Sequence, residues 1–297
     1  MLTHLFSTPQ TPARVVILGA NGFISLALAA ALREDRIPFR TVGSQEVNLI
    51  DDSAPQKLRA IVDQADAIVI TSALTPDKGR DVATLMKNLQ MASHLCGFLG
   101  SVTCSHVLYI SSDAVYDSRS SLITESSSCE PSDLYALMHV GREKMIRLAC
   151  QTANIPLAIV RPCAVYGAGD THNSYGANRF IRTALADGVI RLFGEGEEKR
   201  DHIYVDDVAM ILKLCLLHRC SGVVNAVSGQ AVSFMDIAKL VLSAAPRAVN
   251  LELQPRGGPI THRHFDISVL VRAFPGFRAR SVNVGIPQML AAMSRIT

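Results

Sequence analysis

Residues 14–25 read RVVILGANGFIS, an apolar run followed by a turn that contains Gly19 and Gly22. The run 14–18 is rich in β-branched residues and does not alternate with polar ones, which is typical of a strand buried on both faces of a parallel sheet. A run of good helix formers, 26–33, follows the turn. This segment therefore predicts a strand, a tight glycine turn and a helix.

The glycine turn is a candidate phosphate-binding site. Gly19 and Gly22 follow the predicted strand directly and open the predicted helix, where backbone N–H groups and the helix dipole can hold a pyrophosphate. Ser25 occupies the third glycine position of the dinucleotide fingerprint and is small enough for close helix packing, but it departs from the pattern. A glycine turn without a ligand shows the same letters, so the motif gains its meaning from the rest of the chain.

Strands and helices alternate through the first half of the chain. Strands are predicted at 39–42, 67–71, 106–110 and 157–160, and helices at 54–64, 81–99 and 132–153. Such alternation implies right-handed crossovers and a parallel sheet. We predict an α/β fold, in which residues 13–168 form a Rossmann doubly wound dinucleotide-binding domain. Residues 169–297 are expected to form mainly a smaller C-terminal substrate-binding lobe, with segments that return to the Rossmann domain.

Composition narrows the range of partners and compartments. The chain of 297 residues is 48% hydrophobic and 19% charged, as folded globular proteins are. Its net charge of +3 comes from interspersed residues without a basic block, so nucleic acid is not an expected partner. Seven scattered cysteines without CxxC spacing indicate reduced thiols. With neither a signal peptide nor an apolar run of ~18 residues, we expect a cytoplasmic protein that makes no membrane contact.

Four further sequence segments follow the glycine turn in an order that is informative about the family. They are 109–116 (YISSDAVY), 135–139 (YALMH), 161–170 (RPCAVYGAGD) and 200–209 (RDHIYVDDVA). With this ordered set, nearly the whole chain resembles the extended short-chain dehydrogenase/reductase family of NAD-dependent epimerases and dehydratases. The resemblance implies an NAD(P)-dependent oxidoreductase or isomerase that acts on a nucleotide-activated sugar, as an epimerase or a 4-ketoreductase.

The same resemblance assigns the catalytic positions. It places Ser112 as the hydroxyl that orients the substrate oxygen and Tyr135 as the acid/base that passes the proton while hydride moves. The family's lysine, four residues after the tyrosine, is His139 here. Histidine still reaches the same neighbourhood and can hydrogen-bond a ribose hydroxyl, but it is mostly neutral near pH 7. Lys144 cannot simply replace the lost cation, because nine residues place it on about the opposite face of the helix.

Three interpretations of His139 remain open at this point. The chain is a working enzyme with altered pH dependence, an enzyme that uses another cation nearby, or a catalytically impaired dinucleotide-binding or assembly protein. Asp113 is likewise either an acid/base group or a turn contact. In the dehydratases of the family the pattern continues with a glutamate where this chain has Ala114, which disfavours a 4,6-dehydratase.

Substrate contacts are expected from the second half of the chain. The resemblance places Arg200 on the diphosphate of the nucleotide sugar, with Arg263 as a second candidate and Asn178 as a further substrate-binding residue. Guanidinium suits phosphate because it offers a planar fork of donors, although each arginine could instead form a surface ion pair. The nearby histidines lack a matching acidic or cysteine pattern, so we expect no metal.

NAD and NADP are distinguished at the end of the second strand, where an acid holds the adenosine ribose. Counting about 24 residues from Gly19 leads to Gly43 and Ser44, so no carboxylate stands there and the choice stays open. Asn48 matches the position that contacts adenine in the family. The full set of cofactor-binding residues implied is Gly19, Asn21, Gly22, Phe23, Ile24, Gly43, Ser44, Asn48, Ser72, Ala73, Asn88, Ser111, Tyr135, His139 and Pro162.

Oligomeric state is also suggested by the resemblance. The predicted helices 81–99 and 132–153 correspond to those through which extended-family members dimerise as a four-helix bundle. Their apolar residues could equally pack within the chain. We expect a homodimer.

Overall fold

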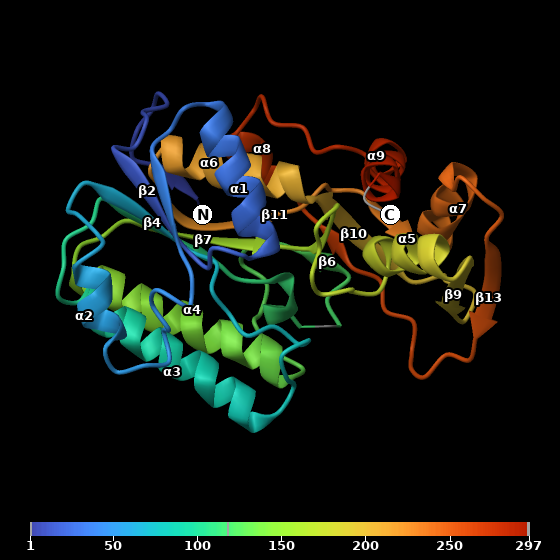
Figure 1. Ribbon diagram of the computed structural model, residues 1–297, viewed down its shortest axis with the longest axis horizontal. Coiled ribbons are helices and arrows are strands. Elements are labelled where there is room, and N and C mark those ends of the chain that lie inside the picture. Colours follow the sequence, from blue (N-terminus) through green and yellow to red (C-terminus); the bar gives the residue numbers. More distant parts are fainter. Residues whose placement is uncertain (1, 118, 296–297) are drawn as a thin grey trace.

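Residues 2–117 and 119–295 are described by the computed structural model, whose largest element is a seven-stranded sheet (Figure 1). The strand order is β1-β11-β7-β5-β4-β2-β3, and each pair is parallel except β1 with β11. The strands are β1 (Thr3–His4), β2 (Arg14–Leu18), β3 (Phe39–Val42), β4 (Asp66–Ile70), β5 (His106–Ile110), β7 (Leu157–Pro162) and β11 (Cys220–Ala226). The predicted doubly wound parallel sheet is confirmed.

Helices cover both faces of this sheet, as Figure 1 shows. On one face lie α1 (Phe23–Glu34), α6 (Val205–Leu217) and α8 (Ser268–Ala273); on the other lie α2 (Ala54–Arg59), α3 (Val82–Leu99) and α4 (Leu134–Thr152). Successive residues of β2 serve the two layers, since Val15 and Ile17 join one apolar cluster and Val16 and Leu18 the other. This is why the strand reads as an unbroken apolar run. Within the described ranges no helix is both long and apolar enough to cross a bilayer.

A smaller lobe lies beside the sheet and is built mainly from the second half of the chain (Figure 1). It contains α5 (Ala177–Ala186), α7 (Phe234–Ala244), α9 (Val282–Ser294) and two small sheets, with a third apolar cluster among them. A third small sheet packs instead on an apolar cluster of the large sheet, through Ile123 and Phe265. The small sheets are β8 (Ala164–Tyr166), β10 (Lys199–Tyr204) and β12 (Ala231–Ser233); β9 (Val189–Phe193) with β13 (Asn250–Gln254); and β6 (Leu122–Ile123) with β14 (His264–Phe265). Between these elements the chain returns to the large sheet as β11.

One predicted helix is shorter than the sequence pattern suggested. The pattern extends over 54–64, but α2 ends at Arg59. Arg14 Nη2 donates to the carbonyl of Ile61 at 2.9 Å, and the N–H of Asp63 donates to Asp66 Oδ2 at 2.7 Å. These long-range and turn contacts use backbone groups that another helical turn would need.

Candidate functional site

The glycine turn lies at the carboxyl end of β2, beside the end of β4. Gly19 has φ +118°, and a Cβ at this position would lie 2.5 Å from Thr71 Oγ1, so the turn requires glycine. Gly22 is the N-cap of α1, where no side chain makes a capping bond and the first turn holds no acidic residue. The positive end of the α1 dipole is therefore not neutralised by a neighbouring side chain, which suits an anion.

Ser25, at the third glycine position of the turn, makes a hydrogen bond that a glycine could not make. Its buried Oγ lies 2.7 Å from Thr71 Oγ1, and the Thr71 hydroxyl in turn donates to the carbonyl of Leu18 at 2.7 Å. The substitution thus adds a polar link between the ends of β2 and β4. These two neighbouring strands flank the topological switch point of the sheet, the place where open α/β sheets bind ligands.

Two adjoining cavities follow the ends of these strands, with volumes of about 340 Å³ and 540 Å³. Both are lined by Gly22, Thr71 and Ala73, so they lie side by side, and we call the two together the track. The smaller cavity is lined by these predicted cofactor residues: Gly19, Asn21, Gly22, Gly43, Ser44, Asn48, Ser72 and Ala73. The larger is lined by Phe23, Ile24, Ser111, Ser112, Tyr135, His139 and Pro162. Residues scattered over the first 162 positions thus come together at one edge of the sheet.

Ser112 and Tyr135 meet in the larger cavity. Ser112 ends the loop after β5, where its Oγ accepts the N–H of Ala114 at 3.1 Å. Tyr135 lies in the first turn of α4, which Asp133 caps by accepting the N–H of Ala136 at 2.8 Å. Burial raises the pKa of Tyr135 to about 12, and a hydrogen bond with Ser112 partly offsets the rise. At neutral pH the phenol therefore keeps its proton.

His139, one helical turn beyond Tyr135, is 3% exposed and lines the same cavity. Its Nδ1 lies 2.8 Å from the hydroxyl of Tyr109, a buried residue of β5. Burial first, and then the nearby Arg142 cation, lower the pKa of His139 to about 3. The ring is therefore neutral at physiological pH. Its Nε2 is buried without a hydrogen-bond partner among the described residues.

Arg142 supplies a buried cation that the sequence analysis missed. Its side chain is fully buried; Nη2 donates to the carbonyl of Ser72 at 2.7 Å and Nη1 to Asn88 Oδ1 at 3.2 Å. Asn88 Oδ1 also accepts the N–H of Leu74 at 2.9 Å. The predicted cofactor residue Asn88 therefore fixes the backbone of the segment after β4 through its hydrogen bond with Leu74. Arg142 in turn lowers the pKa of Tyr135, in opposition to burial.

A buried ion pair fixes α4 against the sheet. Arg161 of β7 donates to both carboxylate oxygens of Glu143, at 2.8 Å and 2.6 Å, and the Ser111 hydroxyl donates to Glu143 Oε1 at 2.6 Å. Both charged side chains are less than a tenth exposed. The pair ties the helix that carries Tyr135 to the ends of β5 and β7. Ser111 is thereby committed to Glu143 while it lines the cavity.

The predicted substrate residues lie outside the residues that line the two cavities. Arg263 Nη1 pairs with Asp113 Oδ2 at 3.1 Å, and Arg200 Nη2 pairs with Glu198 Oε1 at 2.8 Å. Burial raises the pKa of Asp113, and Arg263 partly offsets this. Asn178 makes internal bonds, since its side chain contacts the backbone on either side of the Tyr166 turn. All three side chains thus have partners within the chain.

Several cavity residues were not predicted and come from two loops. Asp77 Oδ1 accepts from the Thr75 hydroxyl at 2.6 Å and lies 3.0 Å from His172 Nδ1, so the loops 71–80 and 167–176 meet across the larger cavity. Burial opposes ionisation, but the bonds from Thr75 and His172 outweigh it and hold the pKa of Asp77 well below its usual value. Arg179 also lines this cavity, with its guanidinium 5.8 Å from the ring centre of Tyr175. No motif marks these residues in the sequence.

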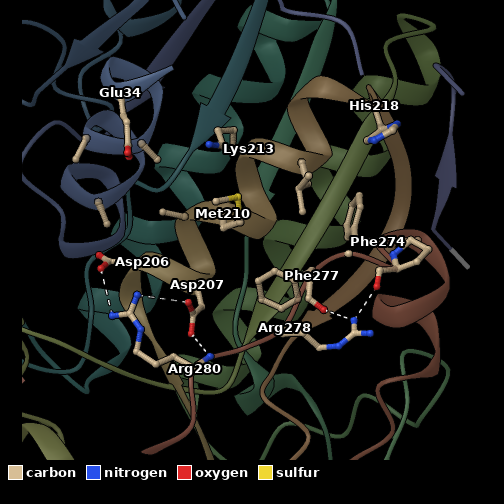
Figure 2. A pocket seen from close by; sticks show the side chains of 18 of the residues that line it. Glu34, Asp206, Asp207, Met210, Lys213, His218, Phe274, Phe277, Arg278 and Arg280 are labelled. Carbon is tan, nitrogen blue, oxygen red and sulfur yellow. Dashed lines mark hydrogen bonds and ion pairs between the residues drawn. The ribbon is translucent and has the colours of Figure 1, made fainter. Parts of the chain in front are cut away.

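A third cavity, of about 880 Å³, lies between α1, α6 and residues 273–280 (Figure 2). In Figure 2 the backbone N–H of Arg280 donates to Asp207 at 2.7 Å, and its guanidinium reaches Asp206 at 3.5 Å. The guanidinium of Arg278 donates to backbone carbonyls of its own loop. None of the predicted site residues, all within the described ranges, lines this cavity. These charged groups hold the C-terminal segment against α6.

Comparison with known proteins supplies the family. The sequence profile of the NAD dependent epimerase/dehydratase family matches residues 15–227, most of the chain. The chain belongs to this family. The expected kinship with the extended short-chain dehydrogenases/reductases is confirmed. A curated relative, the "Uncharacterized UDP-glucose epimerase YtcB" of Bacillus subtilis (strain 168), is 22% identical over 212 residues, which cover 70% of this chain and 67% of the relative.

Solved structures of similar shape agree with this family fold. UDP-glucuronic acid 4-epimerase from Bacillus cereus, in complex with UDP-glucuronic acid and NAD, superposes with a TM-score of 0.82 at 19% identity, covering 96% of this chain and 100% of that one. A GDP-L-fucose synthetase from Naegleria fowleri bound to NADP gives 0.86 at 15% identity, covering 99% and 98%. At these identities the likeness shows the epimerase/dehydratase fold.

Proposed function

We propose that this member of the epimerase/dehydratase family is an NAD(P)-dependent enzyme that acts on a nucleotide-activated sugar, as an epimerase or a 4-ketoreductase. Tyr135 is the acid/base and Ser112 the orienting hydroxyl. The observation that carries the proposal is that Ser112 and Tyr135 line the same cavity, which is also lined by Gly22 of the glycine turn. Similar structures bound to UDP-glucuronic acid with NAD, and to NADP, support the choice of ligands.

The residues present fit a dinucleotide. A side chain at Gly19 would fill the space beside Thr71, and two buried polar atoms on the track, Ser72 Oγ and His139 Nε2, lack partners among the described residues. When bound, the dinucleotide supplies or accepts the hydride. No carboxylate is among the described residues that line the smaller cavity, where Gly43 and Ser44 begin the loop after β3. This composition leaves room for a 2′-phosphate and does not select NAD over NADP.

Proton transfer at Tyr135 starts from the protonated phenol. Since the pKa of Tyr135 is raised to about 12, the residue can donate a proton to a ketone oxygen held by Ser112, the direction needed in a reduction. The reverse direction needs the phenolate, which the positive charge of Arg142 favours. An epimerase uses both directions in each turnover, whereas a ketoreductase uses the first.

For the substrate we propose the larger cavity and the lobe of residues 169–297. Arg179 already lines this cavity. Arg200 and Arg263 can take the diphosphate if phosphate oxygens replace Glu198 and Asp113 as partners of the two guanidinium groups. Such an exchange keeps each guanidinium paired with an anion.

We also propose a homodimer through α3 and α4. Four large apolar side chains on these helices, Val82, Met86, Leu137 and Leu148, are between 43% and 67% exposed. A bundle with the same helices of a second copy would remove them from water. We place the enzyme in the cytoplasm, because its seven cysteines are all free thiols.

Mass spectrometry of ligand retained by the native protein is the first test. NAD or NADP that stays bound through purification supports an epimerase, whereas stoichiometric oxidation of NADH or NADPH by added nucleotide sugars supports a reductase. Tyr135→Phe should lower turnover by at least about 100-fold with little change in cofactor affinity. Tyr116→Phe, at a buried tyrosine outside both cavities, is the matched control. Calorimetry that detects no binding of any of the four cofactor forms would refute the proposal.

A second candidate function is a non-catalytic dinucleotide-binding or assembly protein. The observation that favours it is the neutral, buried His139 where the family has a lysine. This candidate predicts that wild type and Tyr135→Phe bind the dinucleotide equally and that neither turns over UDP-, GDP- or dTDP-sugars. Turnover by wild type that Tyr135→Phe abolishes excludes it.

A further inference from the structure

The hydrogen bond between Tyr109 and His139 can be formed in two ways. In the first arrangement the phenol of Tyr109 donates to Nδ1, and the neutral imidazole carries its hydrogen on Nε2. The Nε2–H is then the one buried group of the pair without a partner. If Nδ1 donates to the phenol oxygen, both the Tyr109 hydrogen and the Nε2 lone pair are left unpaired. Tyr109 is 1% exposed and has no other hydrogen-bond acceptor among the described residues. The first arrangement leaves fewer buried groups unsatisfied and is therefore the more stable.

The groups around the ring favour the same arrangement. The guanidinium of Arg142 lies 5.5 Å from the ring centre of Tyr109, on the same side as Ser72 and Asn88. This buried cation repels a protonated imidazole and attracts the lone pairs of the phenol oxygen, which directs the phenol hydrogen away from itself. Tyr135, packed edge-on against the ring with centroids 4.8 Å apart, is neutral and adds no charge.

We propose that Tyr109 is a positioning residue that fixes His139 as a neutral Nε2–H donor, and that this donor binds a sugar hydroxyl of the ligand in the cavity. Nδ1 points toward Tyr109 in the interior, and the two nitrogens of an imidazole point in roughly opposite directions. The unpaired, buried Nε2–H therefore points away from Tyr109, and His139 is among the residues that line the larger cavity. This inference rests on the proposed function for the identity of the ligand, the ribose next to the nicotinamide.

The first experiment reads the tautomer without any ligand. Protein labelled with ¹⁵N-histidine is studied by long-range proton–nitrogen NMR between pH 5 and pH 8, and His139→Gln identifies the His139 signals by their loss. A neutral ring protonated at Nε2 is expected across the whole range. Tyr109→Phe should convert this signal to a mixture of the two tautomers. A wild-type ring protonated at Nδ1, or a charged ring at pH 6, overturns the proposal.

The second experiment measures binding of NAD⁺, NADP⁺, ADP-ribose and ADP by calorimetry. ADP lacks the second ribose, so Tyr109→Phe should raise the Kd of the other three ligands about five- to tenfold and leave that of ADP within about twofold. Tyr116→Phe removes an equally buried hydroxyl, which donates to Asn225 at 2.7 Å, and should change none of the four. Equal effects of the two variants would overturn the role of Tyr109. If wild type bound ADP but none of the other ligands, the ribose contact and the proposed function would both fail, while the NMR result would still decide the tautomer.

Discussion

The pair formed by Glu143 and Arg161 is the most informative place to perturb this fold. Glu143→Gln keeps the shape of the side chain and removes its charge, which leaves the Arg161 guanidinium in the interior with one neutral acceptor. Three charge-assisted hydrogen bonds of 2.6 to 2.8 Å converge on this carboxylate. Both side chains are less than a tenth exposed, so water cannot replace the lost partner.

The expected loss follows from this burial. Removing one partner of a buried, hydrogen-bonded ion pair costs about 3–5 kcal/mol, because an unpaired charge remains in a low dielectric. The chain contains a matched control at its surface, where Arg191 and Glu252 pair at 2.9 Å with side chains 52% and 46% exposed. For Glu252→Gln the expected loss is below about 1 kcal/mol, since solvent screens such pairs.

Urea unfolding at pH 7, followed by circular dichroism, measures both changes in the free energy of unfolding. The geometry predicts a difference of at least about 2 kcal/mol between Glu143→Gln and Glu252→Gln. If the two variants lose the same amount, the buried pair does not hold α4 to the sheet, and the argument from burial is wrong.

Four further outcomes are expected. Gly19→Ala should lower the free energy of unfolding by about 1–3 kcal/mol in urea titrations, because φ is +118° and the Cβ has no room. At Gly43 a Cβ would make only an ordinary 3.5 Å contact, so Gly43→Asp should fold normally and raise the preference for NAD over NADP by about tenfold in calorimetry. Burial lowers the pKa of His106 from 6.5 to about 4, so the unfolded chain takes up the proton first as pH falls; wild type should lose about 1.4 kcal/mol per pH unit more than His106→Gln between pH 6 and pH 4. His139→Lys should lower the free energy of unfolding at pH 7, since a second cation would face Arg142, and this deficit should shrink at pH 9.5 as the lysine loses its proton.

The fold could be predicted from the sequence because each central strand is buried on both faces. A strand buried on both faces appears in the sequence as an apolar run without helical periodicity. The runs at 14–18 and 106–110 therefore locate β2 and β5 directly. The end of α2 could not be located in this way. It depends on Arg14, a residue 45 positions earlier than Arg59, whose contact with Ile61 exists only once the sheet has formed.

The gathering of most of the predicted cofactor residues at one edge could also be expected from the sequence, because they follow strands whose carboxyl ends meet there. What the sequence could not show is which polar groups are already used inside the protein. The sequence alone does not show whether Asn88 faces a ligand or hydrogen-bonds the backbone of Leu74. It likewise does not show whether Arg200 is free to bind a phosphate or is paired with Glu198. These choices depend on loops whose paths no local pattern determines.

The position of Arg142 in the sequence indicates a cation near Tyr135. It lies seven residues after Tyr135, which is about two helical turns and therefore the same face of α4, whereas Lys144 is exposed on another face. Counting beyond the next turn would have identified Arg142 as the neighbouring cation. Its complete burial, which makes its charge effective, could be learned only from the structure.

Arg142 and the histidine at position 139 are best understood as one arrangement. The Arg142 cation lowers the pKa of His139, so it would also repel a second cation at position 139. The adjacent buried Glu143 cannot offset that repulsion, because it is paired with Arg161. A cation at 142 therefore favours a neutral residue at 139. In our proposal the neutral ring of His139 still offers an N–H donor beside Tyr135, as the family's lysine would. The positive charge comes instead from Arg142, about one turn further along α4. It follows that His139 adds no pH dependence of its own to this site near neutrality, because burial and the Arg142 cation keep its ring neutral.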